Sequence, residues 1–219
     1  MKRSKLVVQS LTALVLAGSS ITAMAADTGW YAGVGVGSAQ AKDLVSAAEF
    51  DADLLADYGI TATSTIDDSD TAWKLFAGYR FNKNLAVEGG YADLGKATFD
   101  SIVTSGGGGR VSASWGAKAW SLAAVGILPV TDQFEVFGKI GGYFYNADLS
   151  ATGSGGGGTV SVSVDDDGTG LLFGVGASYS FTKNIAVRAE WERYKDVGDE
   201  NAIGTSDVDM LSVGIQYKF

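Results

Sequence analysis

The sequence predicts an all-β fold, an eight-stranded antiparallel transmembrane β-barrel with the topology of an up-and-down meander. Apolar residues alternate with small or polar ones at a period of two along most of the chain, which indicates strands. Short polar turns alternate with long polar links, a layout typical of outer-membrane barrels. After residue 25, no apolar run approaches the roughly 20 residues of a membrane-spanning helix.

The composition excludes several classes of function. The 219 residues include no Cys, which removes disulfides, thiolate nucleophiles and cysteine metal sites. They include no His, which removes Ser-His-Asp and Cys-His catalysis and the common zinc motif with two histidines. The formal net charge of −9 makes a nucleic-acid partner unexpected.

The first 25 residues have the features of a secretory signal peptide. Lys2, Arg3 and Lys5 form a basic start, residues 6–17 are largely apolar, and Ala23-Met24-Ala25 has the small-x-small pattern of a cleavage site. A short membrane anchor is the alternative, but the apolar run is too short for one. We therefore expect residues 1–25 to be removed on export and residues 26–219 to form the barrel domain.

Eight segments alternate between two faces and are the expected strands. They include residues 30–37, 73–81, 85–91, 117–128, 134–144, 171–181, 185–192 and 210–219. In segment 117–128 the pattern does not decide which residues share a face. In the other segments one face carries large apolar residues and the opposite face carries mostly Gly, Ala and Ser with isolated charges.

The connections between these strands alternate in length. Residues 81–84, 129–132 and 181–184 are short turns rich in Asn, Asp, Thr and Pro. The other links are long and polar, at roughly residues 40–70, 96–113, 149–166 and 197–207. Two of them contain tetraglycine runs, Gly106 to Gly109 and Gly155 to Gly158, which we expect to be flexible and without a packing role.

Closure into a barrel decides which face points outward. Hydrocarbon requires every backbone polar group to be paired, since each unpaired one costs several kcal/mol there. The small face suits a crowded interior, and the apolar face then meets lipid. Aromatic residues near the strand ends fit interfacial girdles; they are Trp30, Tyr79, Phe81, Trp120, Phe134, Tyr179, Phe181, Trp191, Tyr217 and Phe219. A secreted soluble β-sandwich, acting as a binding module, is the alternative.

Several stretches resemble the transmembrane domain of the OmpA family. They are Val87-Glu88-Gly89-Gly90-Tyr91-Ala92-Asp93-Leu94-Gly95, Leu128-Pro129-Val130-Thr131-Asp132, Lys139-Ile140-Gly141-Gly142, residues 185–191 and residues 211–219. The resemblance implies a small barrel in the outer membrane of a Gram-negative cell. The first long link is longer and more acidic than the family's, and the family's peptidoglycan-binding domain has no counterpart, so we expect no cell-wall anchoring.

Eight charged residues fall on the predicted lumen face. They are Lys74, Arg80, Glu88, Glu135, Lys139, Arg188, Glu190 and Lys218. A barrel of this size holds only side chains or one small ligand, and charges buried there must pair. The family resemblance implies a pair between Glu88 and Arg188 that blocks the water path. A second family pair is not retained, because its places hold Ala123 or Ala124 and Ser178, so we expect a lumen plugged once.

The last strand ends on alternating apolar residues that close with Tyr217 and Phe219. The resemblance implies that the barrel-assembly machinery reads this ending as an assembly signal. We also expect periplasmic chaperones as transient partners, outer-membrane lipid and lipopolysaccharide as lasting ones, and a monomeric barrel.

Two further patterns point to chemistry only weakly. Glu190 and Glu192 share a face, as the two acids of a glycoside hydrolase would, but Arg188 lies beside them and nothing marks a substrate cleft. The acidic links, with Asp165-Asp166-Asp167 and eight acids between residues 43 and 70, suit Ca²⁺ or Mg²⁺ but lack calcium-loop spacing. We therefore expect no enzyme activity, no catalytic or metal-ligating residues and no cofactor.

The expected function is structural. The barrel would contribute to envelope integrity and display its long links outside the cell, where adhesion or recognition can take place. A narrow porin-like channel for small solutes or ions is the alternative.

Overall fold

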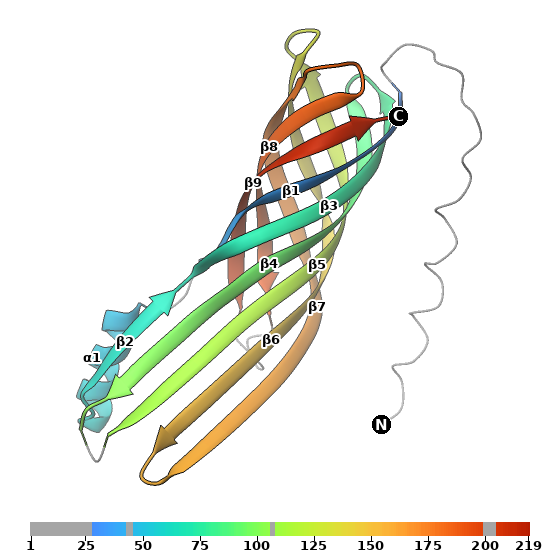
Figure 1. Cartoon of the computed structure of the whole chain (residues 1–219). Coiled ribbons are helices and arrows are strands. Elements are labelled where there is room, and N and C mark those ends of the chain that lie inside the picture. Colours follow the sequence, from blue (N-terminus) through green and yellow to red (C-terminus); the bar gives the residue numbers. More distant parts are fainter. Residues whose placement is uncertain (1–27, 43–45, 106–107, 199–204) are drawn as a thin grey trace, which may run out of the picture.

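The structure is a computed structural model, which describes residues 28–42, 46–105, 108–198 and 205–219 (Figure 1). The predicted signal peptide, with Ala23 and Ala25, lies outside the described residues. None of the described helices is long and apolar enough to span a membrane.

The described chain contains one helix and nine strands. In chain order they are β1 (Gly29–Ala41), α1 (Ala47–Tyr58), β2 (Ala62–Asp67), β3 (Ser69–Asn82), β4 (Leu85–Val103), β5 (Gly109–Pro129), β6 (Phe134–Gly155), β7 (Gly158–Ser180), β8 (Ile185–Val197) and β9 (Ser206–Lys218).

Eight of these strands close into a ring, which confirms the predicted fold class. Each pairs antiparallel with its neighbours, β1 joins β3 to β9, and the β4–β5 pairing completes the circle. Closure leaves no free edge in the wall, as a structure surrounded by hydrocarbon requires. The ninth strand, β2, pairs with β4 beyond the ring.

The three short turns lie where the sequence predicts them, but two of the long polar links prove to be continuations of the strands that they connect. β4 and β5 continue as a ladder to Val103 and Gly109, and β6 and β7 continue to Gly155 and Gly158. With β2 they form a second region, the extension sheet: β2 and residues 97–103, 109–115, 149–155 and 158–164. Figure 1 shows it projecting obliquely from the end of the barrel opposite the C-terminus.

The second tetraglycine run is a tight turn rather than a flexible tether. Gly155 pairs with Gly158, and the two residues between them, Gly156 and Gly157, have φ of 57° and 95°. Two positive φ values are what the preferred two-residue hairpin turn requires, and glycine adopts them without steric cost. The run therefore fixes the tip of the β6–β7 hairpin. Part of the first run, residues 106–107, lies outside the described residues.

The first long link also folds. It contains α1 and β2. Ser46 caps the start of α1, because its hydroxyl accepts the Glu49 N–H, and Gly59, in the left-handed conformation, caps the end. Asp51 accepts hydrogen bonds from the backbone N–H and the hydroxyl of Ser64 on β2. The ring of Phe50 lies 5.0 Å from that of Phe99. The helix therefore covers the β2–β4 side of the extension sheet.

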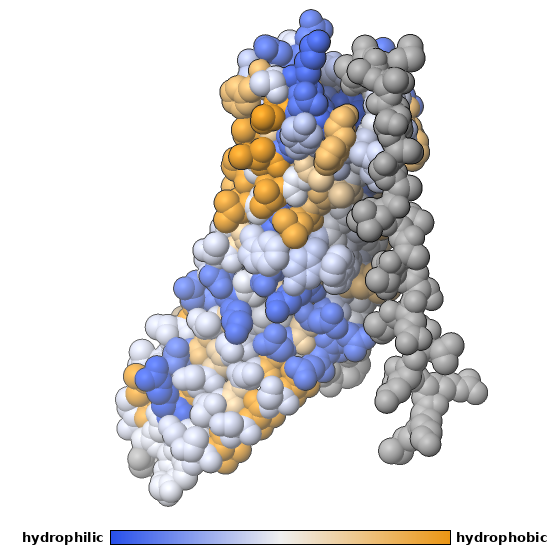
Figure 2. Space-filling view, turned by 45° about the vertical axis from the view of Figure 1, so that its right-hand side comes forward, coloured by the Kyte–Doolittle hydropathy of each residue, from blue (hydrophilic) through white to orange (hydrophobic). Residues whose placement is uncertain are grey.

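The outer wall of the ring is apolar, as predicted. Figure 2 shows hydrophobic residues gathered in a band on the barrel, with hydrophilic residues at both of its margins. Aromatic residues contact one another at each margin: Trp30 with Tyr79 and Tyr217 with Phe219 near the short turns, and Tyr91 with Trp120 at the other end. The structure also settles segment 117–128, where Trp120 and Leu122 face outward and Ala119 and Ala123 inward.

The lumen holds large aromatic side chains beside the Gly, Ala and Ser that predominate on the predicted inner face. Five of them lie directly across the ladder from a glycine: Gly33 pairs with Phe76, Gly78 with Tyr31, Gly170 with Tyr143, Gly168 with Tyr145 and Gly176 with Phe137. A Cβ on any of these glycines would overlap the opposite ring. The inner glycines therefore make room for the rings that face them across the ladder.

Candidate functional site

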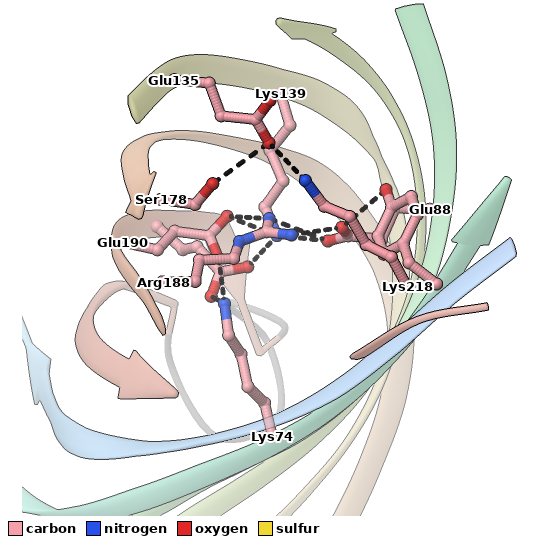
Figure 3. Close-up of polar contacts among 10 residues, drawn as sticks. Lys74, Glu88, Glu135, Lys139, Ser178, Arg188, Glu190 and Lys218 are labelled. Atoms are coloured by element: carbon pink, nitrogen blue, oxygen red, sulfur yellow. Dashed lines mark hydrogen bonds and ion pairs between the residues drawn. The ribbon is translucent and has the colours of Figure 1, made fainter. Parts of the chain in front are cut away.

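Six ionised side chains meet in the middle of the lumen, and we call them the central cluster (Figure 3). The acids are Glu88 from β4 with Glu190 and Glu192 from β8, and the bases are Lys74 from β3, Lys139 from β6 and Arg188 from β8. Each of the six side chains is at most 6% exposed. Three positive and three negative charges balance, so the cluster adds no net charge to the interior.

Every member of the central cluster contacts at least two charges of opposite sign. Arg188 lies 2.6 Å from Glu88 and 3.0 Å from Glu190. Lys139 Nζ lies 2.8 Å from Glu190, 2.5 Å from Glu192 and 3.3 Å from Glu88. Lys74 binds both Glu190 and Glu192. Tyr31 completes the set, because its hydroxyl donates to Glu88 at 3.0 Å.

Inner glycines and two rings position the cations. Lys74 pairs across the ladder with Gly35, Lys139 with Gly174 and Arg188 with Gly214, so on one side the base of each long side chain meets no other side chain. The Arg188 guanidinium lies 4.6 Å from the centre of the Phe76 ring and 4.1 Å from that of Phe137. Contacts of this kind favour a cation that has lost its water.

A second group of charges, the basal cluster, lies nearer the short turns. Glu135 on β6 lies 2.9 Å from Arg80 and 3.5 Å from Lys218, and accepts the Ser178 hydroxyl at 3.1 Å. Arg80 also donates to the backbone carbonyls of Asn82 and Lys83 in the first short turn. The expectation of a lumen plugged once is therefore wrong. Ser178, at the place of the lost family pair, donates instead to Glu135, which pairs across the lumen with Arg80 of β3 and Lys218 of β9.

An apolar layer closes the other end of the lumen. Fully buried side chains fill it, among them Tyr143, Tyr194, Leu172, Val208 and Met210. The Tyr143 hydroxyl donates to the Lys195 carbonyl at 2.5 Å, and the Tyr143 and Tyr194 rings lie 5.2 Å apart. Beside the central cluster, a cavity of about 10 Å³ has room for a single water at most. Among the described residues, three successive layers thus obstruct the lumen.

All eight charges assigned to the lumen face lie in it, in two clusters. Lys74, Glu88, Lys139, Arg188 and Glu190 belong to the central cluster, and Arg80, Glu135 and Lys218 to the basal one. Two further members, Glu192 and Tyr31, were absent from the candidate set. The alternation that places Arg188 and Glu190 inward also places Glu192 inward, and Tyr31 has the same parity as the inner glycines of β1.

The carboxylate pair considered for hydrolysis is part of this network. Glu190 and Glu192 both bind Lys74 and Lys139, and both are buried. Neither carboxylate is therefore open to a substrate. The acidic residues of the long links do not form a metal site in the part of the chain that the structure describes, where no three or more Asp or Glu side chains lie close enough to hold a metal ion.

The predicted assembly residues end the closing strand. Phe219 is 77% exposed, its ring lies 5.1 Å from that of Tyr217, and its backbone N–H donates to the Trp30 carbonyl at 3.0 Å. Both rings therefore stand on the outer wall at the margin of the apolar band.

Comparisons with known proteins agree with this geometry. A family model described as the OmpA-like transmembrane domain matches residues 25–219. Outer membrane protein A of Yersinia pseudotuberculosis is 32% identical over 210 residues, covering 94% of this chain and 54% of that protein. Its counterpart in Salmonella typhi is 30% identical over 210 residues, covering 94% and 53%. The chain thus spans about half the length of these curated relatives.

One solved structure shows the same fold. The outer membrane protein OprG from Pseudomonas aeruginosa superposes with a TM-score of 0.50 at 16% identity, covering 88% of this chain and 97% of that one.

Proposed function

Because the chain belongs to the family of OmpA-like transmembrane domains, which are β-barrels of the Gram-negative outer membrane, we propose that it reinforces this membrane as a closed barrel. In the same proposal, it displays the extension sheet outside the cell for recognition. In outer-membrane barrels short turns face the periplasm and longer hairpins the exterior. The extension sheet lies at the end opposite the short turns.

The observation that carries this proposal is the obstructed lumen. A channel needs a continuous aqueous path, but the basal cluster, the central cluster and the apolar layer follow one another along the axis. Moving an ion past them would require breaking buried charge pairs, each of which is expensive to separate. These layers favour the structural role over the channel.

A deletion strain tests the structural role. We expect loss of the gene to raise the permeability of the outer membrane to detergents and large antibiotics, and the wild-type chain supplied from a plasmid to restore it. Unchanged permeability in the deletion strain would contradict the reinforcing role.

Planar-bilayer recordings test the closed lumen. We expect the folded wild-type protein to give no reproducible ion steps, and Glu88→Ala also to stay silent, because the apolar layer and the basal cluster remain in place. Reproducible steps from the wild type would support the narrow channel instead, and steps from Glu88→Ala alone would make the Glu88–Arg188 pair the plug.

We further propose that Tyr217 and Phe219 form the ending that the barrel-assembly machinery recognises, after periplasmic chaperones deliver the chain. The exposure of Phe219 supports this role, because a ring that packs against little of the barrel contributes little to the stability of the fold. The outer wall would then hold lipid and lipopolysaccharide around a monomer. Cleavage after Ala25 is part of the same proposal, and predicts a mature protein that begins at Ala26.

Removing Phe219 tests the assembly role. We expect the deletion to lower the yield of heat-modifiable barrel in the outer membrane, and Phe219→Trp to restore it, because an aromatic ring is kept. Refolding of the purified deletion variant in detergent is the control, and should be unchanged. Equal membrane yields for the deletion and the wild type would count against an assembly signal.

A further inference from the structure

The extension sheet has an open edge along β7. β6 pairs with β7 over its whole length, from the Phe134–Tyr179 pair to the Gly155–Gly158 pair. β8 pairs with β7 only between Leu172 and Ser180. Among the described residues, therefore, no strand lies on the other side of residues 158–164. Their outward N–H and C=O groups are a template for one more strand.

This edge lacks the features that usually prevent strand addition. Residues 158–164 contain no Lys, no Pro and no charge. Val160, Val162 and Val164 share one face, and the first two are 70% and 57% exposed. Thr159, Ser161 and Ser163 share the other face, where Ser161 and Ser163 already form hydroxyl contacts with Thr152 and Ser150 of β6. An added strand of the same composition would place valine beside valine on one face and hydroxyl beside hydroxyl on the other.

The adjoining charges select an antiparallel partner strand. Asp165-Asp166-Asp167 follow the uncharged edge directly. In a parallel pairing of two copies in register, the two acidic triplets would lie side by side and repel. In an antiparallel pairing centred on Ser161, Asp165 lies opposite Gly157 of the other copy. The two Asp165 residues are then about 26 Å apart at the usual strand rise, well beyond the screening length of physiological salt.

The barrel determines where such a partner can be anchored. β7 runs from the hairpin tip at Gly158 toward the barrel, and this direction is the same for every copy in one membrane. Copies in one membrane therefore all point the same way along the membrane normal and cannot present these edges antiparallel. Antiparallel pairing requires two barrels that point toward each other from facing membranes.

We propose that the occupant of this edge is a second copy of the chain on a neighbouring cell, paired antiparallel along residues 158–164. The extension sheets of the two copies then form one continuous sheet that links the two outer membranes. One short pairing is weak by itself, but many copies on two apposed surfaces act together. This inference rests on the proposed display of the extension sheet outside the cell.

Cysteine cross-linking in whole cells tests the pairing, because the chain has no cysteine of its own. Two cell populations carry Ser161→Cys with different epitope tags and are mixed under mild oxidation. We expect a disulfide dimer that contains both tags, and faster settling of cells that carry the wild-type protein than of cells without it. Ser161→Lys should abolish the settling, because it places a charge on the edge. Thr152→Lys, on the same face but one strand inside the sheet, should leave it unchanged.

The outcomes separate the inference from the function on which it rests. A membrane-impermeant maleimide should label Ser161→Cys on intact cells, and absence of labelling overturns both the display and the pairing. Labelling without a two-tag dimer, with settling unaffected by Ser161→Lys, overturns the pairing and leaves the display intact. Dimers with one tag only, or a cross-link to a different protein, also overturn it, since each identifies another occupant.

Discussion

Arg188→Ala is expected to lower the free energy of unfolding by about 3–5 kcal/mol, the usual cost of removing one partner from a buried ion pair. Arg188 binds Glu88 and Glu190 at the centre of the lumen and lies between two aromatic rings. Its loss leaves three carboxylates with two lysines, so one negative charge stays uncompensated in a nearly water-free interior. Urea unfolding in lipid vesicles, followed by tryptophan fluorescence, measures the change.

The matched control removes the same side chain from an exposed ion pair. Arg110 lies 2.8 Å from Asp100 on the polar face of the extension sheet, where both side chains are exposed to water. Hydrogen bonds from the Ser112 hydroxyl and from Arg110 lower the pKa of Asp100, but a solvated carboxylate loses little when one partner leaves. Arg110→Ala should leave the unfolding curve unchanged. Equal effects of the two substitutions would contradict the role of the central cluster in stability.

Gly37→Ala is expected to prevent most of the protein molecules from closing into a barrel. A Cβ at this position would overlap the carbonyl oxygen of Leu211 and crowd the Cα of Ser212 on β9. Both neighbours are backbone atoms and cannot turn aside as a side chain can. The overlap lies between β1 and β9, the first and last strands of the ring, so relief of the clash separates the seam that closes it. Overpacking of this kind costs at least about 1–3 kcal/mol.

Gly35→Ala is the control for this substitution. Gly35 lies on the same strand and the same inner face, but its added Cβ would come no closer than 3.4 Å to another atom, the Cγ of Lys74. The heat-modifiable fraction on a gel should fall sharply for Gly37→Ala and remain near the wild-type level for Gly35→Ala. A folded fraction near the wild-type level for Gly37→Ala would contradict the close approach of β1 to β9 at this position.

The sequence was sufficient to predict the ring of the barrel because burial alternates there residue by residue. Each ring strand has lipid on one side and a crowded lumen on the other, and this contrast predicts that Lys139 and Glu190 point inward. The same contrast is absent beyond the membrane. Thr159 to Val164 alternate hydroxyl and valine side chains, but a neighbouring glycine run and acidic triplet resemble a loop. The extension sheet was missed for that reason.

The pairing of the lumen charges was harder to predict. A strand pattern tells which way Glu88 or Lys139 points, but not how far its side chain reaches across the axis. That reach depends on which residues face each other between strands, as Gly174 faces Lys139 and Gly35 faces Lys74. Such a register arises only on closure of the ring. The second cluster around Glu135 was therefore not foreseen.

The most direct measurement of the central claim is NMR spectroscopy of side-chain methyl groups with the protein in lipid nanodiscs. Methyls of Val34, Val213 and Ile215 on the outer wall should show contacts to lipid chains, and those of Val125 and Leu172 in the lumen should show none. A water-soluble gadolinium chelate should broaden Val160 and Val162 at the hairpin tip and leave the other five unaffected. Lipid contacts at Val125 or Leu172, or broadening of Val213 and Ile215 by the chelate, would contradict a closed barrel embedded in the membrane.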